Sequence, residues 1–531
     1  MDIVILELGV PTAVENSASL SNAANDPVYA GSAEQPNLAS AFVSVARSRP
    51  DQPALISNQG TFSYRWLFRA ADRVRRHLSD RPKHTAGGRV ALQLSNSVEY
   101  LAAFYGALLA DYVVVPLPVA LEELRRRSIF ELCQPDVIIS RHEDFSANDH
   151  DGSVSILRLQ DELDDQVPLP LPRRFGRDLA MLLFTSGSTG EPKGVMLSHS
   201  NLLANVDQIL HELPISTDDR ALVVLPFCHA LGNSILQTHV LSGATLLLKG
   251  VLTFPSSIVA ALKELQATSF SAVPEVYGML LKYGRLGEVH LPDLRYMAVA
   301  GGELRYEWAI DVASRISPAS FYMMYGQSEA TSRLASLDPT ELRRRRGSIG
   351  KPIWGVELAV LDDANHEVPV GEVGMLCARG ENVMCGYWQD PKGTTDVLGA
   401  DGWLRTGDLA HRDQEGFFYL KGRANLLVKV QGHRVHPSEI EVVVEENFPH
   451  IRAVATPVPW GGDMRFAMFL FSHDKQPIDI ASVRAICQQA LPDYKRPVSF
   501  EILDRLPLTS SYKVDRAALK SLVASKPSSA A

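Results

Sequence analysis

The chain has 531 residues, of which 46% are hydrophobic and 21% charged, values typical of a soluble globular protein too long for one hydrophobic core. Its 52 basic and 61 acidic residues leave a formal net charge of −9, which argues against nucleic acid or an anionic membrane surface as an obligatory partner. No apolar run approaches the roughly twenty residues of a membrane-spanning helix.

The cysteines and the N-terminal residues indicate the compartment in which the protein is expected. The five cysteines lack C-x-x-C spacing, so the sequence indicates neither a disulfide framework nor a zinc site. The first eight residues are apolar but partly acidic, without the basic start of a signal peptide. We therefore expect a cytoplasmic protein. Residues 1–36, rich in Ala, Ser, Asn and Pro from Glu15 onward, are expected to form a loose leader.

Strand and helix patterns alternate along the first 300 residues, which predicts a mostly parallel sheet flanked by helices. Strands are expected at 53–56, 90–94, 113–117, 137–139, 182–184, 221–225, 244–248, 268–273 and 297–300. Helices are expected at 66–78 and 100–110.

The pattern changes near residue 353, where short strands are separated by Gly, Asp, Asn and Pro. Beyond residues 421–425, helical patterns at 440–446 and 483–491 alternate with strand patterns at 466–471 and 500–503. The sequence therefore predicts an α/β protein in two domains. A large N-terminal domain over 37–422 combines mixed, mostly parallel sheets and flanking helices with a β-rich subdomain at 353–422, and a small mobile α+β domain follows over 423–531.

A loop rich in glycine and hydroxyl groups follows the apolar strand at 182–184. Its glycines let backbone N–H groups approach an anion, its hydroxyls donate hydrogen bonds, and Lys193 supplies a positive charge. Because Lys193 precedes a glycine and another apolar run, this is not the P-loop pattern G-x-x-x-x-G-K-[ST]. The sequence predicts a polyphosphate site made by Thr185, Ser186, Gly187, Ser188, Thr189, Gly190 and Lys193.

This loop resembles the phosphate-binding motif of the adenylate-forming superfamily, which includes acyl-CoA and aryl-CoA ligases, luciferases and adenylation domains of peptide synthetases. Further motifs of that family follow in order, and the resemblance extends from about Leu38 to about Leu519. Activation of a carboxylate by ATP needs a protein carboxylate to hold Mg²⁺, and the resemblance implies that Glu329 is this ligand. It also implies that Ser328, in place of the usual Thr, donates to phosphate. The other nucleotide-binding residues implied here are Gly301, Gly302, Glu303, Tyr325 and Gly326.

The C-terminal third carries further residues that the resemblance implies. Asp408 follows a strand and a glycine turn, where its two oxygens can accept hydrogen bonds from both ribose hydroxyls. Arg423 is implied as the second ribose contact, and Gly432 as the position where the backbone approaches a thiol arm. Lys513 is implied as the catalytic cation between the substrate carboxylate and the α-phosphate.

Two residues depart from the family pattern. Residues 422–441 resemble the hinge motif that begins the mobile C-terminal domain of the family. Asn425 stands in it where relatives usually carry Asp, sometimes Lys, so charge-dependent control of the hinge does not follow from the resemblance. Tyr512 stands beside Lys513 where relatives usually carry Gly, so the approach of this loop differs.

The segment 226–234 resembles the one beside the acid pocket, and His229 is implied as its gate or orienting catalytic residue; a partly buried structural histidine is the alternative. The segment has no acid to pair a substrate ammonium, which favours a neutral-tailed aliphatic or simple aryl acid. Glu275 and Glu303 leave this point open. The expected pocket walls are Asn233, residues 273–277, 300–303 and 324–327, and Ser332.

Taken with the resemblance, these residues predict a two-step ligase. A small-molecule carboxylic acid and ATP with Mg²⁺ form acyl-AMP, and coenzyme A then takes the acyl group. The alternative acceptor is the phosphopantetheine arm of an acyl or peptidyl carrier protein, as in free-standing adenylation enzymes. A binding protein without turnover is the alternative from another class. The acid, the thiol and the choice between monomer and homodimer stay open.

Overall fold

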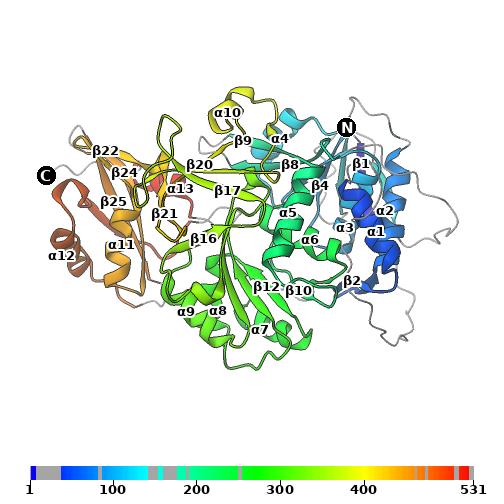
Figure 1. Cartoon of the computed structure of the whole chain (residues 1–531), viewed down its shortest axis with the longest axis horizontal. Helices are drawn as coiled ribbons and strands as arrows, with labels where there is room; N and C mark the ends of the chain where they lie inside the picture. The colour runs from blue at the N-terminus through cyan, green and yellow to red at the C-terminus, as the bar shows by residue number, and fades with distance from the viewer. Residues whose placement is uncertain are drawn as a thin grey trace. The chain divides into compact units, whose positions relative to one another are not determined.

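The structure is a computed structural model of the full chain, and it describes residues 2–7, 37–79, 81, 87–141, 154–159, 176–186, 191–248, 254–460, 463–472, 476–507 and 514–524. The chain divides into two compact units. The first unit contains residues 1–358 and 378–404, and the second contains residues 359–377 and 405–531. Figure 1 shows both units, coloured along the chain.

An eight-stranded sheet lies in the first unit. Its strands are β1 (Asp2–Glu7), β4 (Arg89–Gln93), β5 (Val113–Leu117), β6 (Val137–Ser140), β7 (Val154–Arg158), β8 (Leu179–Ser186), β9 (Pro192–Ser198) and β19 (Gly386–Tyr387). They are arranged in the order β19-β9-β8-β5-β4-β6-β1-β7. Neighbours from β7 to β8 are parallel, whereas β9 and β19 are antiparallel at one edge. β4 and β5 are buried along their whole lengths, as expected of parallel strands in the middle of a sheet.

The first strand corrects one prediction. Residues 1–36 were expected to form a loose leader, but Asp2–Glu7 within them is β1, which pairs with both β6 and β7. Its side chains Val4, Ile5 and Leu6 are buried, so their apolar character is explained by the sheet. Residues 8–36 lie outside the described part of the chain.

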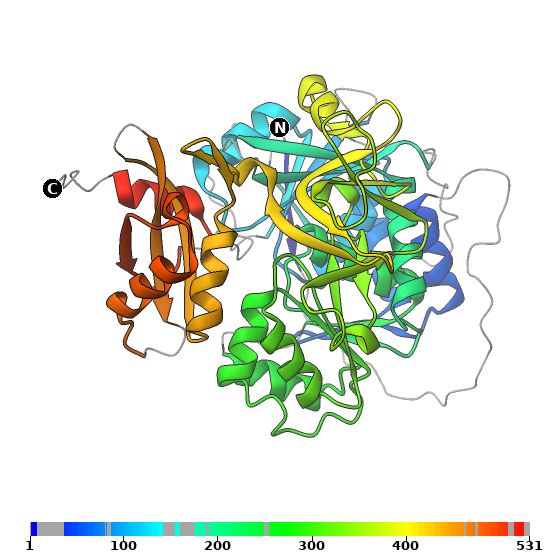
Figure 2. The same ribbon diagram turned by 60° about the vertical axis from the view of Figure 1, so that its left-hand side comes forward.

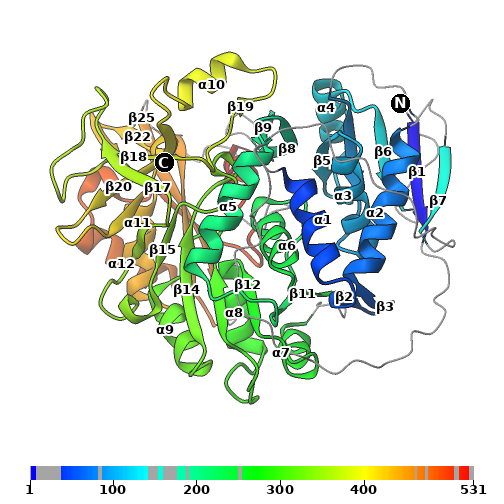
Figure 3. The ribbon, with the colours of Figure 1, turned by 45° about the vertical axis from the view of Figure 1, so that its right-hand side comes forward.

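Three helices pack together beside this sheet: α1 (Leu38–Ser48), α2 (Tyr64–Ser79) and α3 (Val98–Leu109) (Figure 3). α1 begins at a capping box between Asn37 and Ser40, and Ser97 caps α3 by accepting from the Tyr100 N–H. Every residue of α3 is buried, which explains why its sequence is apolar on all sides.

Further strands of the first unit are part of a longer sheet, and this part is called the second sheet. Their order is β16-β15-β14-β13-β12-β10-β11-β2-β3. Its strands are β2 (Pro53–Ser57), β3 (Gly60–Ser63), β10 (Arg220–Leu222), β11 (Thr245–Leu248), β12 (Ser269–Ala272), β13 (Tyr296–Val299), β14 (Ser320–Tyr325), β15 (Ala335–Leu337) and β16 (Ser348–Pro352). The strands from β14 to β2 are parallel to their neighbours.

The other helices of the first unit are α4 (Glu123–Cys133), α5 (His199–Glu212), α6 (Ala230–Ser242), α7 (Pro255–Glu264), α8 (Pro274–Tyr283), α9 (Tyr306–Arg315) and α10 (Pro391–Val397). α5 and α6 lie side by side (Figures 1 and 3), and α7, α8 and α9 form a consecutive packed set. Single strand–helix–strand steps between parallel neighbours place the ends of β12, β13 and β14 at one edge of the sheet.

The second unit contains β20 (Leu404–Arg412, from its second residue), β21 (Phe418–Arg423), the hairpin β22 (Val428–Val430) and β23 (His433–Val435), and a sheet of β24 (Ile451–Trp460), β25 (Asp463–Ser472) and β26 (Ser499–Ile502). Helices α11 (Ser438–Asn447), α12 (Ile480–Ala490) and α13 (Arg516–Ala524) accompany this sheet, in orange and red in Figure 2. Phe466, Met468 and Leu470 on one face of β25 join the core with α11 and α12, while Ala467 and Phe469 on the other face pack with Leu519 of α13. This alternation is the period of two expected for a strand covered on both faces.

The predicted α/β class is therefore confirmed, and the expected helices and strands occur within a few residues of their predicted positions. β10 is shorter than expected and ends at Leu222 instead of residue 225. The strands β17 (Val356–Leu361) and β18 (Gly374–Gly380) occupy the region where short strands were expected. The domain boundary at residue 423 stays a prediction.

Candidate active site

Three expected segments, one of the acid pocket and two of the nucleotide site, follow parallel strands at one edge of the second sheet. Val273 follows β12, the Gly301–Gly302 pair follows β13 after Ala300, and Tyr325 ends β14. Gly301 has φ +90°, a left-handed conformation that glycine adopts without steric cost. In open α/β sheets, ligands bind beyond the carboxyl ends of the strands, so this edge is the expected position for a nucleotide. Glu303 is exposed after β13.

The turn after β14 carries Ser328 and Glu329 in a short 3-10 helix, η3 (Ser328–Ala330). Gly326 makes this turn possible, because a Cβ atom at its position would lie 1.8 Å from the Ser332 carbonyl oxygen. The buried Asn382 side chain donates to the carbonyl oxygens of Ala330 and Arg333, at 3.2 and 2.9 Å. Asn382 thus holds the chain after Glu329 at two carbonyl groups, which fixes the backbone from which the Glu329 carboxylate extends.

The expected phosphate loop connects β8 and β9, which form an antiparallel hairpin. Thr185 is paired with Lys193 across this hairpin, so both side chains lie on the same face. Ser186, the last residue of β8, is paired with Pro192. The loop residues Gly187, Ser188, Thr189 and Gly190 lie outside the described residues, and their phosphate contacts stay a prediction.

Tyr387 joins the two motifs, and sequence reasoning missed it. The Lys193 Nζ atom lies 4.7 Å from the centroid of the Tyr387 ring, and the Tyr387 hydroxyl donates to Glu329 Oε1 at 2.9 Å. β19 holds Tyr387 in place by pairing it with Val195 of β9, and the Met384 N–H donates to the Glu329 carbonyl oxygen. A cation, an aromatic ring and a carboxylate therefore form one continuous arrangement.

This arrangement fits a magnesium ion carried by a nucleotide. Mg²⁺ takes oxygen ligands and is usually held by one or two protein carboxylates together with substrate phosphates and water. Tyr387 occupies Glu329 Oε1, and within the described residues no hydrogen-bond donor is found on Oε2. Glu329 can therefore offer this oxygen to a metal, while the ammonium group of Lys193 attracts phosphate oxygens. Asp390 lies 3.9 Å from Lys193 Nζ and partly balances that charge.

His229 is the N-cap residue of α6, and it is half-buried. The segment before it is fixed by Asn96, another residue that sequence reasoning missed. The Asn96 side chain donates to the Leu225 carbonyl oxygen and accepts from the Phe227 N–H, both at 2.8 Å. Gly232 allows the first turn of α6 to pack on this segment, since its Cβ position lies 2.0 Å from the Pro226 carbonyl oxygen. The orientation of His229 thus depends on backbone contacts that periodicity does not reveal.

The second unit brings the two expected ribose ligands together. Asp408 and Arg423 are paired residues of β20 and β21, and their side chains form an ion pair at 2.8 Å. Arg423 also donates to the Thr406 carbonyl oxygen at 3.0 Å, and the Thr406 hydroxyl anchors the turn by donating to the Leu376 carbonyl oxygen at 2.7 Å. Asp408 is buried, so its orientation is well defined.

The remaining expected residues of this unit are placed differently. Gly432 lies in the two-residue turn between β22 and β23, with φ +86° beside Gln431 at +48°. This turn conformation by itself favours glycine, and the space around the Gly432 Cβ position is open. Gly432 therefore lies in another hairpin than the β20–β21 pair that contains Asp408 and Arg423. Its contact with a thiol stays a prediction. Lys513 and Tyr512 lie outside the described residues.

The hinge segment shows a contact that the sequence did not suggest. The imidazole ring of His436 packs against Gly422, where a Cβ atom would lie 2.1 Å from the ring. His436 Nε2 is 3.1 Å from the Arg423 carbonyl oxygen. Burial lowers the pKa of His436, so the ring is neutral at neutral pH and donates to this carbonyl. Asn425 is exposed in the short helix that follows.

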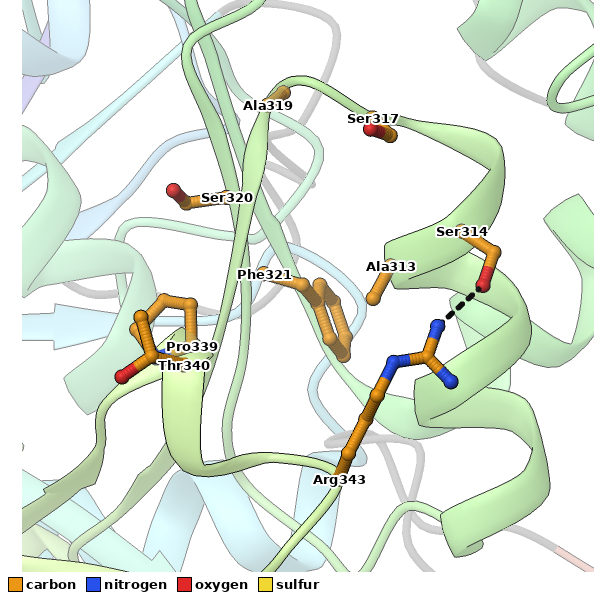
Figure 4. Close-up of a pocket in the computed structure, with 9 residues that line it drawn as sticks. All are labelled: Ala313, Ser314, Ser317, Ala319, Ser320, Phe321, Pro339, Thr340 and Arg343. Atoms are coloured by element: carbon orange, nitrogen blue, oxygen red, sulfur yellow. Dashed lines mark hydrogen bonds between the residues drawn. The ribbon is translucent and has the colours of Figure 1, made fainter.

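A cavity of about 430 Å³ in the first unit is lined by none of the residues of these motifs (Figure 4). It is lined by residues from the end of α9, the start of β14 and the segment 339–343, including Arg343, whose guanidinium donates to the Ser314 hydroxyl at 3.3 Å. Because it lies at the amino end of β14, opposite the Tyr325 end, it is not the expected nucleotide position.

Known proteins are similar to this chain over most of its length. The family model described as AMP-binding enzyme matches residues 42–388. Feruloyl-CoA synthase of Amycolatopsis sp. is 32% identical over 438 residues, which cover 81% of this chain and 87% of that protein. The long-chain-fatty-acid–CoA ligase of Escherichia coli O6:H1 is 30% identical over 532 residues, covering 90% and 92% of the two chains.

Solved structures agree with these relatives. The o-succinylbenzoate coenzyme A synthetase MenE of Bacillus subtilis, in complex with ATP and a magnesium ion, matches with a TM-score of 0.80 and 26% identity over 92% of this chain and all of that chain. ATP-bound MatB from Rhodopseudomonas palustris matches with a TM-score of 0.81 and 25% identity, over 92% and 99% of the two chains. Among the described residues, no helix is both long and apolar enough to cross a membrane.

Proposed function

Because the chain belongs to the AMP-binding enzyme family of adenylate-forming ligases and is an AMP-forming acid–thiol ligase, we propose that it joins a small carboxylic acid to coenzyme A at the expense of ATP. The observation that carries this proposal is the Lys193–Tyr387–Glu329 arrangement. It puts a phosphate-attracting cation and a metal-binding carboxylate on one aromatic ring, within the segment that the family model covers.

The first step forms acyl-AMP. A carboxylate oxygen of the acid attacks the α-phosphorus of ATP, the bond to the bridging oxygen breaks, and pyrophosphate leaves. Lys193 and the hydroxyls of the β8–β9 loop bind phosphate oxygens, and Glu329 would hold Mg²⁺, which would supply charge neutralisation at the phosphates. Asp408 and Arg423 bind the ribose, and Lys513 offsets the repulsion between the carboxylate and the α-phosphate.

The second step forms the thioester. The sulfur of the thiol attacks the acyl carbon, the bond to the phosphate oxygen breaks, AMP leaves, and the thiol proton passes to solvent. Coenzyme A is the acceptor that best fits the feruloyl-CoA synthase, the long-chain-fatty-acid–CoA ligase and the o-succinylbenzoate coenzyme A synthetase, which carry coenzyme A in their names. The acid is an aliphatic or simple aryl acid, since segment 226–234 offers no carboxylate for a substrate ammonium.

A screen of carboxylic acids for pyrophosphate release, followed by detection of AMP and acyl-CoA, tests this function. If no acid of a broad panel supports pyrophosphate release, the proposed function is contradicted. Thioester formed on a carrier protein but not on coenzyme A would replace the proposed acceptor while keeping the first step.

Lys513→Ala separates the two steps. We expect acyl-AMP formation to fall by about a hundredfold or more, because a positioned charge at a developing oxyanion contributes on that order. Thioester formation from supplied acyl-AMP should be preserved. An equal loss in both steps would contradict the role of Lys513, and Lys520→Ala, an exposed lysine of α13, is the matched control.

A further inference from the structure

Arg333 is a buried arginine for which the proposed mechanism has no use. It lies between η3 and β15, one residue beyond the expected pocket wall at Ser332, and is only 3% exposed. Its Nε and Nη1 atoms have no hydrogen-bond partner, and no carboxylate of the described residues forms an ion pair with its guanidinium. A buried charge in this condition is costly unless something pairs with it.

The backbone of Arg333 is well anchored, so the unpaired side chain is not the result of a loose loop. Its carbonyl oxygen accepts from Asn382 at 2.9 Å and lies 3.5 Å from the Asn205 amide nitrogen of α5. The next residue is also fixed, because the Leu334 N–H donates to the Tyr325 carbonyl oxygen at 2.8 Å.

The surroundings of the guanidinium are the interior beside α5, α6 and β13. Glu212 of α5 and Tyr296 of β13 influence its charge electrostatically, and Arg333 in turn acts on His239 of α6. Burial lowers the pKa of Arg333 to about 10, so it keeps its charge at neutral pH. Burial also lowers the pKa of His239, whose Nδ1 lies 2.8 Å from the Ile235 carbonyl oxygen, so this ring does not add a second charge.

Asp219, a fully buried acidic residue that acts on His239, is already occupied by other partners. Asp219 accepts from both Arg295 at 2.7 Å and the Ser216 N–H at 2.6 Å, and it also accepts from the Thr268 hydroxyl at 2.5 Å. Arg295 therefore has the partner that Arg333 lacks. The two arginines therefore allow a paired guanidinium (Arg295) to be compared with an unpaired one (Arg333).

Apolar packing connects this interior with two expected wall segments of the acid pocket, 300–303 and 324–327. Leu231, the second residue of α6, packs against a cluster that includes Tyr296, Ala300 and Met324. Leu231, Ile235 and His239 are spaced by four residues and lie on one face of α6. This face of α6 therefore runs from Leu231, two residues after His229, to His239, on which Arg333 acts electrostatically.

We propose that Arg333 binds a second carboxylate at the far end of the acid, so that the substrate class is dicarboxylic acids. This inference rests on the proposed function and replaces the neutral tail expected from the sequence. A guanidinium presents parallel N–H groups that match a carboxylate in a two-point contact, and an apolar wall ending in such a group suits an aliphatic or aryl diacid. The first carboxylate then remains at the strand ends for reaction with ATP.

Matched acids test the proposal. Glutarate, adipate, suberate and terephthalate are compared with pentanoate, hexanoate, octanoate and 4-methylbenzoate, which have the same carbon numbers. In pyrophosphate release we expect kcat/KM to be at least about a hundredfold higher for the best diacid than for its partner, because a monoacid leaves the buried guanidinium unpaired. In Arg333→Met this ratio should fall below about tenfold while the monoacid remains a substrate. Equal rates for both acids in the wild type, or an unchanged ratio in Arg333→Met, would overturn the proposal.

Stability and binding measurements keep the test independent of turnover. Arg333→Met should fold with an unchanged or higher Tm, whereas Arg295→Met, which leaves Asp219 buried without its partner, should lower Tm. If Arg333→Met does not fold, Arg333→Lys should show a reduced but measurable preference for the diacid, and an unchanged preference would refute the proposal. If no acid yields pyrophosphate, the proposed function fails. A diacid that raises the Tm of the wild type, but not that of the Arg333 variant, would still support the Arg333 site. If no diacid raises the Tm of the wild type in this case, the Arg333 site is overturned as well.

Discussion

At the scale of single residues, Tyr387 is the side chain on which the candidate site depends most directly. Its hydroxyl orients Glu329 at 2.9 Å, while its ring faces Lys193. Tyr387→Phe removes the hydroxyl alone. A hydrogen bond to a charged group contributes about 1.5–3 kcal/mol, so we expect kcat/KM for MgATP to fall by roughly tenfold or more. The loss should be reduced at high Mg²⁺ concentration, because excess metal compensates for a poorly oriented ligand.

The control for this variant is Tyr419→Phe. Tyr419 also donates its hydroxyl to a carboxylate, Asp413, at 3.1 Å, but neither residue belongs to an expected motif. We expect the control to leave the Mg²⁺ dependence of pyrophosphate release unchanged. If both variants behave alike, or if Tyr387→Phe has full activity at limiting Mg²⁺, Tyr387 does not orient the metal ligand.

At the scale of elements, the turn from β14 to β15 carries the expected phosphate and metal ligands because Gly326 allows two backbone segments to touch. Gly326→Ala would place a methyl group 1.8 Å from the Ser332 carbonyl oxygen, so the turn must open. A displacement of about 1 Å at reacting groups can cost about a hundredfold in rate, and we expect a loss of this order in pyrophosphate release. Gly347→Ala, at φ +77° with open space around it, measures the cost of backbone strain alone and should keep activity. Similar activities for the two variants would show that the contact at Gly326 is not needed.

At the scale of the whole molecule, stability is expected to depend on buried histidines in both units. Burial lowers the pKa of His239 in the first unit and of His436 in the second, relative to the usual value of 6.5. The unfolded chain therefore binds protons at a higher pH than the folded chain does, and stability is lost as the pH falls below about 6.5. Asp219 and Arg333 act on His239 in opposite directions, and desolvation is the larger effect.

Thermal unfolding between pH 7.5 and 5 measures this dependence. We expect Tm to decrease across this range and the decrease to be smaller in His239→Gln, which cannot take up a proton. His366→Gln, at an exposed position, is the control and should leave the slope unchanged. A wild-type Tm that is constant or rises toward pH 5 would contradict the assignment.

The sequence alone determined the elements and the chemistry of individual motifs. The alternation of apolar strands with amphipathic helices predicted the α/β class, and the loop from Thr185 to Lys193 predicted a phosphate site. Gly301 and Gly326 were also found from their motif, and the structure explains both by backbone geometry. These features depend on backbone preferences and side-chain periods that act over a few neighbouring residues, which is why they can be recognised without coordinates.

Only the tertiary structure decided which distant side chains meet. Tyr387 lies between Lys193 and Glu329 because β19 pairs with β9, and Asp2–Glu7 is a strand because β6 and β7 lie beside it. Arg333 has the same sequence character as a solvated arginine, and only its burial without a partner distinguishes it. Strand pairing and burial result from the packing of the whole chain, so local sequence patterns do not predict which strands pair or which side chains are buried.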